Sequence, residues 1–249
     1  KPLPRTSTAL YCLWYNGGDT DKENSVTINL AETERDVVPA RRVAIWGLGG
    51  PSVAIRTPEA ILYVDLFTGP SPREDLTKLT PDLDPDEVRR ADAALCTHVH
   101  KDHCHERSLR SLYENTDALF LAPKSCCDEM RTWGFSQDRV VELAPGQQLT
   151  VKGALLTAVP TRDWTDAHAI GFVLQVQGVT LYDGGDCLYG SYFREIGRRW
   201  EIDAALINYA GNPSPDKAPF MEPEEVVQAA KDLRAGRILL KHWDLWQSM

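Results

Sequence analysis

The chain lacks any long apolar run. None of its hydrophobic stretches is long enough to cross a bilayer as a helix. Its first five residues, Lys1-Pro2-Leu3-Pro4-Arg5, also lack the apolar core of a signal peptide. From these two absences we expect a cytoplasmic protein that has no membrane partner.

The sequence also lacks the cysteine patterns of structural zinc sites and of secreted proteins. Its six cysteines are Cys12, Cys96, Cys104, Cys126, Cys127 and Cys187, and they form neither a CxxC pair nor a disulfide framework. We therefore expect reduced thiols, as is usual in the cytoplasm. Cys104 and Cys187 each neighbour a candidate metal ligand, and we interpret both as packing residues.

Basic residues are fewer than acidic ones, 27 against 36. The formal net charge is −9, which disfavours a broad phosphate-binding surface and hence a nucleic-acid partner, although a local basic pocket is compatible with it. The sequence shows no internal repeat and no low-complexity segment. We expect a small-molecule substrate as the partner, and we leave the formation of a homo-oligomer open.

Histidine is rare but concentrated. The chain has only six histidines, and four of them lie between His98 and His105. The stretch Thr97-His98-Val99-His100-Lys101-Asp102-His103 follows the apolar run 93–96, which predicts a short buried strand, and precedes a segment with helical spacing. His98 and His100 are two residues apart, so an extended backbone points both side chains to one side. This density of ligands suits one or two divalent metal ions; the alternative is a polar surface loop.

The order of predicted elements indicates the architecture. Strands are expected at 8–15, 26–30, 41–47, 52–56, 60–66, 93–96, 118–121, 139–143, 148–151, 154–159, 169–176, 179–182, 203–208 and 237–241, and helices at 84–91, 106–113, 124–133 and 222–233. Strands come first and helices interleave later, which is typical of two sheets packed face to face with helices outside. We expect one domain over residues 1–249, in which residues 1–40 are an N-terminal extension that contains a hairpin.

Polar residues recur where these strands end. They are Asp65, the segment His98 to His103, Asp163, Asp186 and His242. Loops that follow strands carry the chemistry in many folds, so these residues are expected to meet at one edge of the sheets.

Together, these segments resemble the metallo-β-lactamase superfamily, whose members combine an HxHxDH turn, a Gly-Asp after a strand and a late strand-end histidine. Further segments are similar to the L-ascorbate-6-phosphate lactonase family. They are Trp46 to Gly49, Val64-Asp65, Ala94 to His103, Ala122 to Cys126, Asp183 to Tyr189, Asn208 to Pro213 and His242 to Trp246. The resemblance implies an α/β fold, the αββα four-layer sandwich of the metallo-β-lactamase type.

The resemblance also implies a ligand set for two divalent ions, Mn²⁺ or Zn²⁺. His98 and His100 would hold the first ion, Asp102, His103 and His242 the second, and Asp186 would bridge them. Superfamily members usually add a third histidine to the first site, but Arg162-Asp163-Trp164 occupies that region here. We expect Asp163 as the substitute, with His168 as the alternative, and an oxygen ligand there shifts preference toward Mn²⁺. The other interpretation of Asp163 is an ion pair with an arginine such as Arg162.

Roles beyond metal binding are also expected. Asp102 would orient the nucleophile and move its proton, and His105 is a candidate proton shuttle or simply a helix-start residue. Asp65, Thr97 and Asp183 are candidates for supporting the ligands from behind. The candidate substrate contacts, each of which could equally be structural, are Lys124, His168, Tyr189, Tyr209 and Asn212.

Three functions are compatible with this site. The leading hypothesis is a metal-dependent hydrolase that uses a metal-activated hydroxide on a lactone or related cyclic ester, with a phosphorylated sugar lactone as the first candidate. The second is a phosphodiesterase of the cyclic-nucleotide or phospholipid type on the same dinuclear site. The third is a non-hydrolytic metal-binding protein or an iron redox protein.

Overall fold

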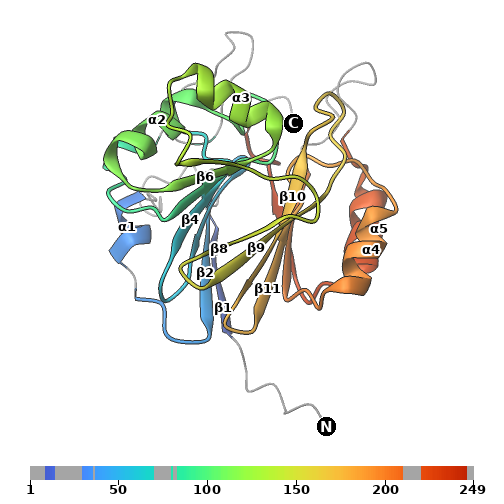
Figure 1. The fold of residues 1–249 in the computed structure, drawn as a ribbon. Coiled ribbons are helices and arrows are strands. Elements are labelled where there is room, and N and C mark those ends of the chain that lie inside the picture. The colour runs from blue at the N-terminus through green and yellow to red at the C-terminus, as the bar shows by residue number, and fades with distance from the viewer. Residues whose placement is uncertain are drawn as a thin grey trace.

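Two sheets lie face to face and helices cover their outer faces (Figure 1). The computed structural model describes residues 9–14, 30–35, 37–69, 80, 83–209 and 220–245. The first sheet contains, in spatial order, β1 (Ala9–Trp14), β2 (Arg42–Gly49), β3 (Ser52–Arg56), β4 (Ile61–Val64), β5 (Ala93–Leu95), β6 (Leu119–Ala122) and β7 (Val140–Glu142). The second contains β13 (Ile238–Lys241), β12 (Ala204–Asn208), β11 (Val179–Asp183), β10 (Ile170–Val176), β9 (Ala154–Pro160) and β8 (Gln148–Val151).

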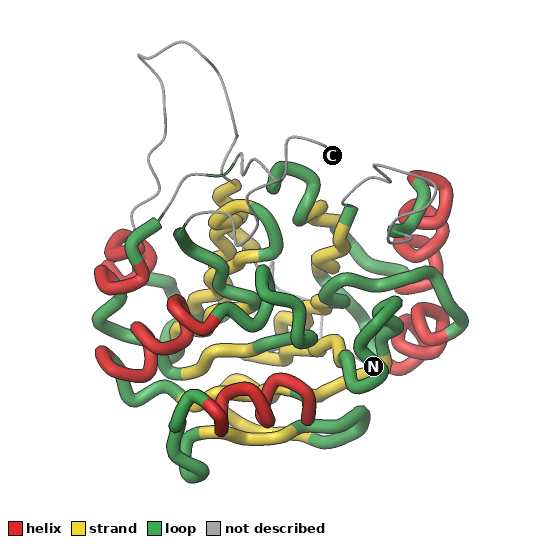
Figure 2. The backbone as a smooth tube through the Cα atoms, turned by 90° about the horizontal axis from the view of Figure 1, so that it is seen from above, coloured by secondary structure: helices red, strands yellow, loops and turns green. Residues whose placement is uncertain are grey.

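Within the described residues, five helices complete the four layers. The helices α1 (Leu30–Arg35), α2 (Glu106–Asn115) and α3 (Lys124–Thr132) pack outside the first sheet, whereas α4 (Tyr192–Arg199) and α5 (Pro223–Leu233) pack outside the second. Seen from above, the helices lie at the periphery and the strands between them (Figure 2). The predicted αββα sandwich is therefore confirmed.

The alternation of side chains along the strands explains why both faces of each sheet are covered. In β2, Val43 and Ile45 join the apolar layer between the sheets, while Ala44 and Trp46 face the helices. In β11, Leu181 faces inward and Tyr182 faces α4 and α5. Successive residues of a strand point to opposite faces, so strands that are apolar at every position require a layer on each side.

The strand directions gather several loops at one edge. The pairs β4–β5 and β5–β6 in the first sheet, and β11–β12 and β12–β13 in the second, are parallel. The sheets also meet at this edge, because the Ile170 amide donates to the Thr97 carbonyl (2.9 Å) and the His242 amide donates to the Gly50 carbonyl (2.8 Å). Segments far apart in the sequence are thereby held side by side.

Some predicted elements differ from the structure. In place of a helix over 84–91 there is a 3₁₀ turn, Pro85–Glu87, which begins at Asp84, whose carboxylate accepts the Asp86 amide at 3.0 Å. A hairpin was predicted between strands at 8–15 and 26–30. In the structure β1 instead pairs in parallel with β2, and Leu30 begins α1. Residues 15–29 lie outside the described residues. The helix α4 was not predicted, because it is only eight residues long and contains Gly197, a residue that disfavours helix.

Gly197 allows α4 to cross close to α5. A Cβ at this position would overlap the carbonyl oxygen of Asp232 and backbone atoms of Leu233. We predict that Gly197→Ala lowers the free energy of unfolding by about 1–3 kcal/mol, because the overlap forces the helices apart. In an unhindered helix the same change would stabilise by about 1 kcal/mol. Urea unfolding would measure the difference, with the exposed neighbour Glu195→Ala as the control; a stabilised Gly197→Ala would contradict this packing.

Candidate metal centre

Asp65 holds the histidine turn from behind. It follows β4 in a left-handed backbone conformation (φ 48°), and its side chain is fully buried. Its carboxylate accepts hydrogen bonds from the Thr97 amide (2.8 Å), the Thr97 hydroxyl (2.9 Å) and His103 Nδ1 (2.9 Å). Burial alone would raise the pKa of Asp65, but the neighbouring His103 and Lys241 charges outweigh it and hold the pKa at about 2. The bond to Nδ1 leaves Nε2 of His103 directed toward the cluster in front.

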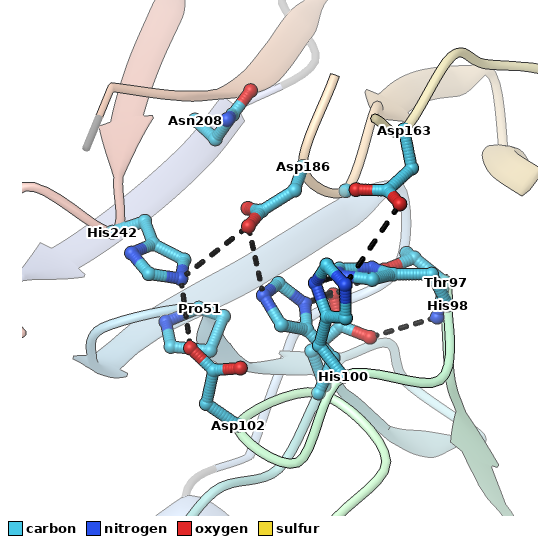
Figure 3. Close-up of polar contacts among 12 residues, drawn as sticks. Pro51, Thr97, His98, His100, Asp102, Asp163, Asp186, Asn208 and His242 are labelled. Carbon is cyan, nitrogen blue, oxygen red and sulfur yellow. Dashed lines mark hydrogen bonds and ion pairs between the residues drawn. The ribbon is translucent and has the colours of Figure 1, made fainter. Parts of the chain in front are cut away.

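The structure brings the predicted ligands into three overlapping groups, within each of which the candidate ligand atoms lie within 4.8 Å of one another. The groups are His98 with His100 and Asp163, His98 with His103 and Asp186, and Asp102 with His103 and His242. The middle group shares one histidine with each of the others, so Asp186 lies between them (Figure 3).

Distances within the cluster are short. Asp186 Oδ2 lies 3.4 Å from His103 Nε2 and 3.7 Å from His242 Nε2, and His242 Nε2 lies 3.2 Å from Asp102 Oδ2. The His103 ring lies between the other two rings, with its centroid 4.0 Å from that of His98 and 5.3 Å from that of His242. Burial and the charge of His103 lower the pKa of His98 to about 4, which keeps this imidazole neutral at pH 7. A neutral imidazole is the form that binds metal.

The donor set fits a divalent cation. Four buried atoms that face the cluster have no hydrogen-bond partner among the described residues: His103 Nε2, Asp163 Oδ2, Asp186 Oδ1 and His242 Nε2. Buried polar atoms are costly when they are left without a partner. Nitrogen and oxygen donors of this kind are the ligands that divalent metals use. Ions bound among these residues would therefore coordinate atoms that make no hydrogen bond within the described residues.

Asp163 lies in the first group, and the alternative His168 lies in none. Asp163 Oδ1 accepts the Thr165 amide (2.8 Å) and the Asp166 amide (2.6 Å), which leaves Oδ2 buried and free of hydrogen bonds. Among the described residues Asp163 lies near His100 and forms no ion pair with Arg162, and His168 is exposed. The loop is held in place by Asp166, whose Oδ2 accepts from the Val99 amide (3.0 Å) and the Ser125 hydroxyl (2.6 Å).

A buried lysine lies beneath the cluster, and the sequence analysis did not identify it. Lys241 Nζ lies 2.8 Å from Asp183 Oδ1 and 3.5 Å from Asp65 Oδ2, and it donates to the Pro51 carbonyl at 3.3 Å. Burial would lower the pKa of Lys241, but Asp183 and Asp65 raise it, so the lysine stays charged. The sequence contained an indication of this burial. Alternate residues of a strand share a face, so Lys241 lies on the same face of β13 as Leu239, which packs against the apolar layer between the sheets.

Other predicted residues are engaged elsewhere. Lys124 Nζ pairs with Asp128 on the surface of α3, and the Tyr189 hydroxyl donates to Asp232 Oδ2 at 2.6 Å. Tyr209 packs against the apolar cluster beneath α4 and α5, and its backbone amide donates to the Lys241 carbonyl. His105 precedes α2, with its Nδ1 2.7 Å from the Ser108 hydroxyl.

Asn212 lies outside the described residues. The five described cysteines are buried and free, and Cys187 Sγ donates to Asn208 Oδ1 at 3.0 Å. No described helix is both long and apolar enough to cross a membrane.

The model of a family described as "Beta-lactamase superfamily domain" matches residues 65–243. A protein of Escherichia coli named Probable L-ascorbate-6-phosphate lactonase UlaG is 26% identical over 264 aligned residues, which cover 87% of this chain and 74% of the relative. Two solved structures share the fold. An isothiocyanate hydrolase from Delia radicum gut bacteria has a TM-score of 0.66 at 17% identity and covers 80% of this chain and 84% of its own. CmlA, a diiron β-hydroxylase from Streptomyces venezuelae, has a TM-score of 0.64 at 16% identity and covers 78% of this chain and 44% of its own.

We predict that Lys241→Met destabilises the metal-free protein by about 3–5 kcal/mol, because it leaves the buried carboxylates of Asp65 and Asp183 without their cation. The matched control is Lys101→Met, which removes an exposed lysine that lies 3.5 Å from Glu129 and should cost at most about 1 kcal/mol. Chemical denaturation after chelation would measure both. Equal stability of the two variants would mean that Lys241 does not compensate the buried acids.

We predict that Asp163→Asn weakens metal binding by more than about tenfold while the fold remains stable. The amide oxygen can still accept the Thr165 and Asp166 amides, whereas the Oδ2 donor is replaced by an NH₂ group. Asp163→His should retain metal better and shift preference from Mn²⁺ toward Zn²⁺, although it loses the turn hydrogen bonds. Competition with a chelating dye would measure affinity, with His168→Ala as the companion variant. Loss of metal only in His168→Ala would move the third ligand to His168.

Proposed function

The chain belongs to the metallo-β-lactamase superfamily, and on that premise we propose that it opens a lactone or a related small cyclic ester. It is a metal-dependent hydrolase. The observation that supports the proposal most strongly is the arrangement of seven candidate ligands in three overlapping groups, with Asp186 in the middle one. The similarity to the lactonase UlaG over most of the chain favours a lactone, with a phosphorylated sugar lactone as the first candidate.

We propose two ions, Mn²⁺ or Zn²⁺. His98, His100 and Asp163 would hold the first, and Asp102, His103 and His242 the second. Asp186 would bridge them, since its carboxylate lies beside histidines of both groups. A shared carboxylate reduces the repulsion between two neighbouring cations. The oxygen of Asp163 in place of a third imidazole favours Mn²⁺ relative to an all-histidine site.

When bound, such ions lower the pKa of water and polarise a carbonyl oxygen. The protein supplies the remaining steps of the chemistry. We assign Asp102 as the carboxylate that orients the attacking water and accepts its proton. Its side chain is 18% exposed and so more open to water than that of Asp186, which is 7% exposed. A general base must reach both water and the reacting centre. His105 stays a proposed proton shuttle, and its Nδ1 lies 2.7 Å from the Ser108 hydroxyl.

The remaining predictions concern the setting of the reaction. A cytoplasmic location, a small-molecule partner and the absence of nucleic acid stay predictions from the composition, and a homo-oligomer stays open. A phosphodiester is the second candidate substrate, because two ions suit that chemistry equally well. Iron redox chemistry is the third, since the diiron hydroxylase CmlA shares the fold.

The test compares loaded enzymes on two classes of substrate. The protein is stripped, reloaded with Mn²⁺, Zn²⁺ or Fe²⁺, and assayed with glucono-δ-lactone, its 6-phosphate and bis(p-nitrophenyl) phosphate. We predict lactone opening with Mn²⁺ or Zn²⁺. In Asp186→Ala, both turnover and bound metal should be lost, because the bridging carboxylate is gone. The matched control is Asp117→Ala, an exposed acid after α2 that lies in none of the three groups.

Two outcomes would overturn parts of the proposal. Hydrolysis of the phosphodiester alone would replace the lactone as substrate and leave the dinuclear site in place. Full activity and full metal content in Asp186→Ala would show that Asp186 is only a turn residue.

A further inference from the structure

A fully buried side-chain amide lies at the edge of the metal cluster and belongs to none of the ligand groups. Asn208 is the last residue of β12, and its side chain is fully buried. Leu206, two residues earlier, packs in the apolar layer between the sheets, so the alternation of the strand turns Asn208 to the same side. Figure 3 shows Asn208 near Asp186 and His242. The sequence analysis included it only in a lactonase-like segment and gave it no role.

The oxygen of this amide holds the loop that carries Asp186. The Cys187 backbone amide donates to Asn208 Oδ1 at 3.1 Å, and the Cys187 thiol donates to the same atom at 3.0 Å. A backbone N–H can only donate, so the atom that faces it is the oxygen, and this fixes the orientation of the side-chain amide. Cys187 directly follows Asp186. The contact therefore holds the backbone one residue beyond the carboxylate of the middle ligand group.

Asp186 is held on both sides. The Gly185 amide before it donates to Asp183 Oδ1 at 2.9 Å, and the contact at Cys187 follows it. Between these two points, Asp186 Oδ2 lies 3.4 Å from His103 Nε2. A metal ligand must stay within about 0.5 Å of its working position. A shift of the loop at Cys187 would exceed this tolerance and would move the carboxylate away from one of the two groups.

The choice of a neutral amide at this position has a physical reason. Asn208 Nδ2 is buried and has no hydrogen-bond partner among the described residues, which is a costly arrangement for a donor. An aspartate would offer the same acceptor to Cys187, but it would add a second buried negative charge next to Asp186. Asn208 therefore supplies an acceptor to the loop without adding charge to the buried acids.

We propose that Asn208 is a positioning residue for metal binding, which holds the Cys187 amide so that Asp186 presents its carboxylate to both ions. Asn208 acts through the loop and touches neither the ions nor the substrate. This role rests on the proposed function, in which Asp186 bridges two ions, and it identifies the contact that places the bridge.

The first test measures whether two Mn²⁺ ions share a ligand. Ions joined by a bridging carboxylate are exchange-coupled, and their electron paramagnetic resonance spectrum differs from that of isolated ions. In Asn208→Ala the coupled spectrum should be lost, and the affinity for Mn²⁺ should fall by about ten- to a hundredfold. Asn208→Asp has the same shape and keeps the acceptor for Cys187, so it should restore the coupled spectrum. A coupled spectrum in both variants, or in neither, would overturn the assignment.

Thr157→Val is the matched control for a general loss of stability. Thr157 is also fully buried and its hydroxyl accepts a hydrogen bond from Gln148 Nε2 at 2.9 Å, but it belongs to no ligand group. Its replacement should lower Tm and leave the affinity for Mn²⁺ unchanged. Equal losses of affinity in Thr157→Val and Asn208→Ala would refute a positioning role. Asn208→Ser, whose hydroxyl ends one bond short of Oδ1, takes the place of the alanine variant if circular dichroism shows that variant unfolded.

Kinetics on the metal-loaded protein distinguish positioning from substrate contact. Asn208→Ala should lower kcat for glucono-δ-lactone by about tenfold or more and leave KM nearly unchanged. A raised KM with unchanged kcat would instead make Asn208 a substrate contact and contradict the proposal. Coupled ions without lactone opening in the unaltered protein would overturn the proposed function and leave the role of Asn208 in place. Uncoupled ions in the unaltered protein would overturn both.

Discussion

Compensation of buried charge around Asp65 is the constraint on which the site depends. A fully buried carboxylate is tolerated only when donors and cations surround it. Thr97 and His103 supply the donors from the loop after β5, and Lys241 supplies the cation from the end of β13. These contacts join the two sheets at the edge where their loops meet. The orientation of His103 toward the cluster follows from the same contacts.

Close backbone approach is the second requirement, and glycine meets it. Gly185 has a φ of 62°, and a Cβ there would lie 2.6 Å from the Thr97 hydroxyl. Only glycine lets the loop after β11 lie against Thr97 in that conformation. Asp186 is the next residue, so this contact sets the depth at which its carboxylate enters the cluster. Thr97 thus positions both sides of the site: it donates to Asp65 and packs against the loop that carries Asp186.

The sequence predicted what is local or strictly periodic. The HxHxDH turn is contiguous, and the alternation of strands such as β2 and β11 indicated layers on both faces. What it could not predict depends on contacts between distant segments. Lys241 is an ordinary strand-end lysine until the fold places it against Asp65 and Asp183, and α4 is stabilised mainly by packing on α5.

Protons and metal ions compete for the same imidazole nitrogens of the cluster, and the surrounding carboxylates favour both. Burial would lower the pKa values of His103 and His242, but Asp186 and Asp102 raise both above their ordinary values, and Asp65 adds to the rise for His103. In the metal-free protein these imidazoles therefore keep their protons to a higher pH than free histidine does. A divalent ion must displace those protons to reach Nε2, so its affinity rises with pH over that range. Asp186 and Asp102 thus stabilise imidazolium ions in the metal-free protein, and the same two carboxylates are candidate metal ligands.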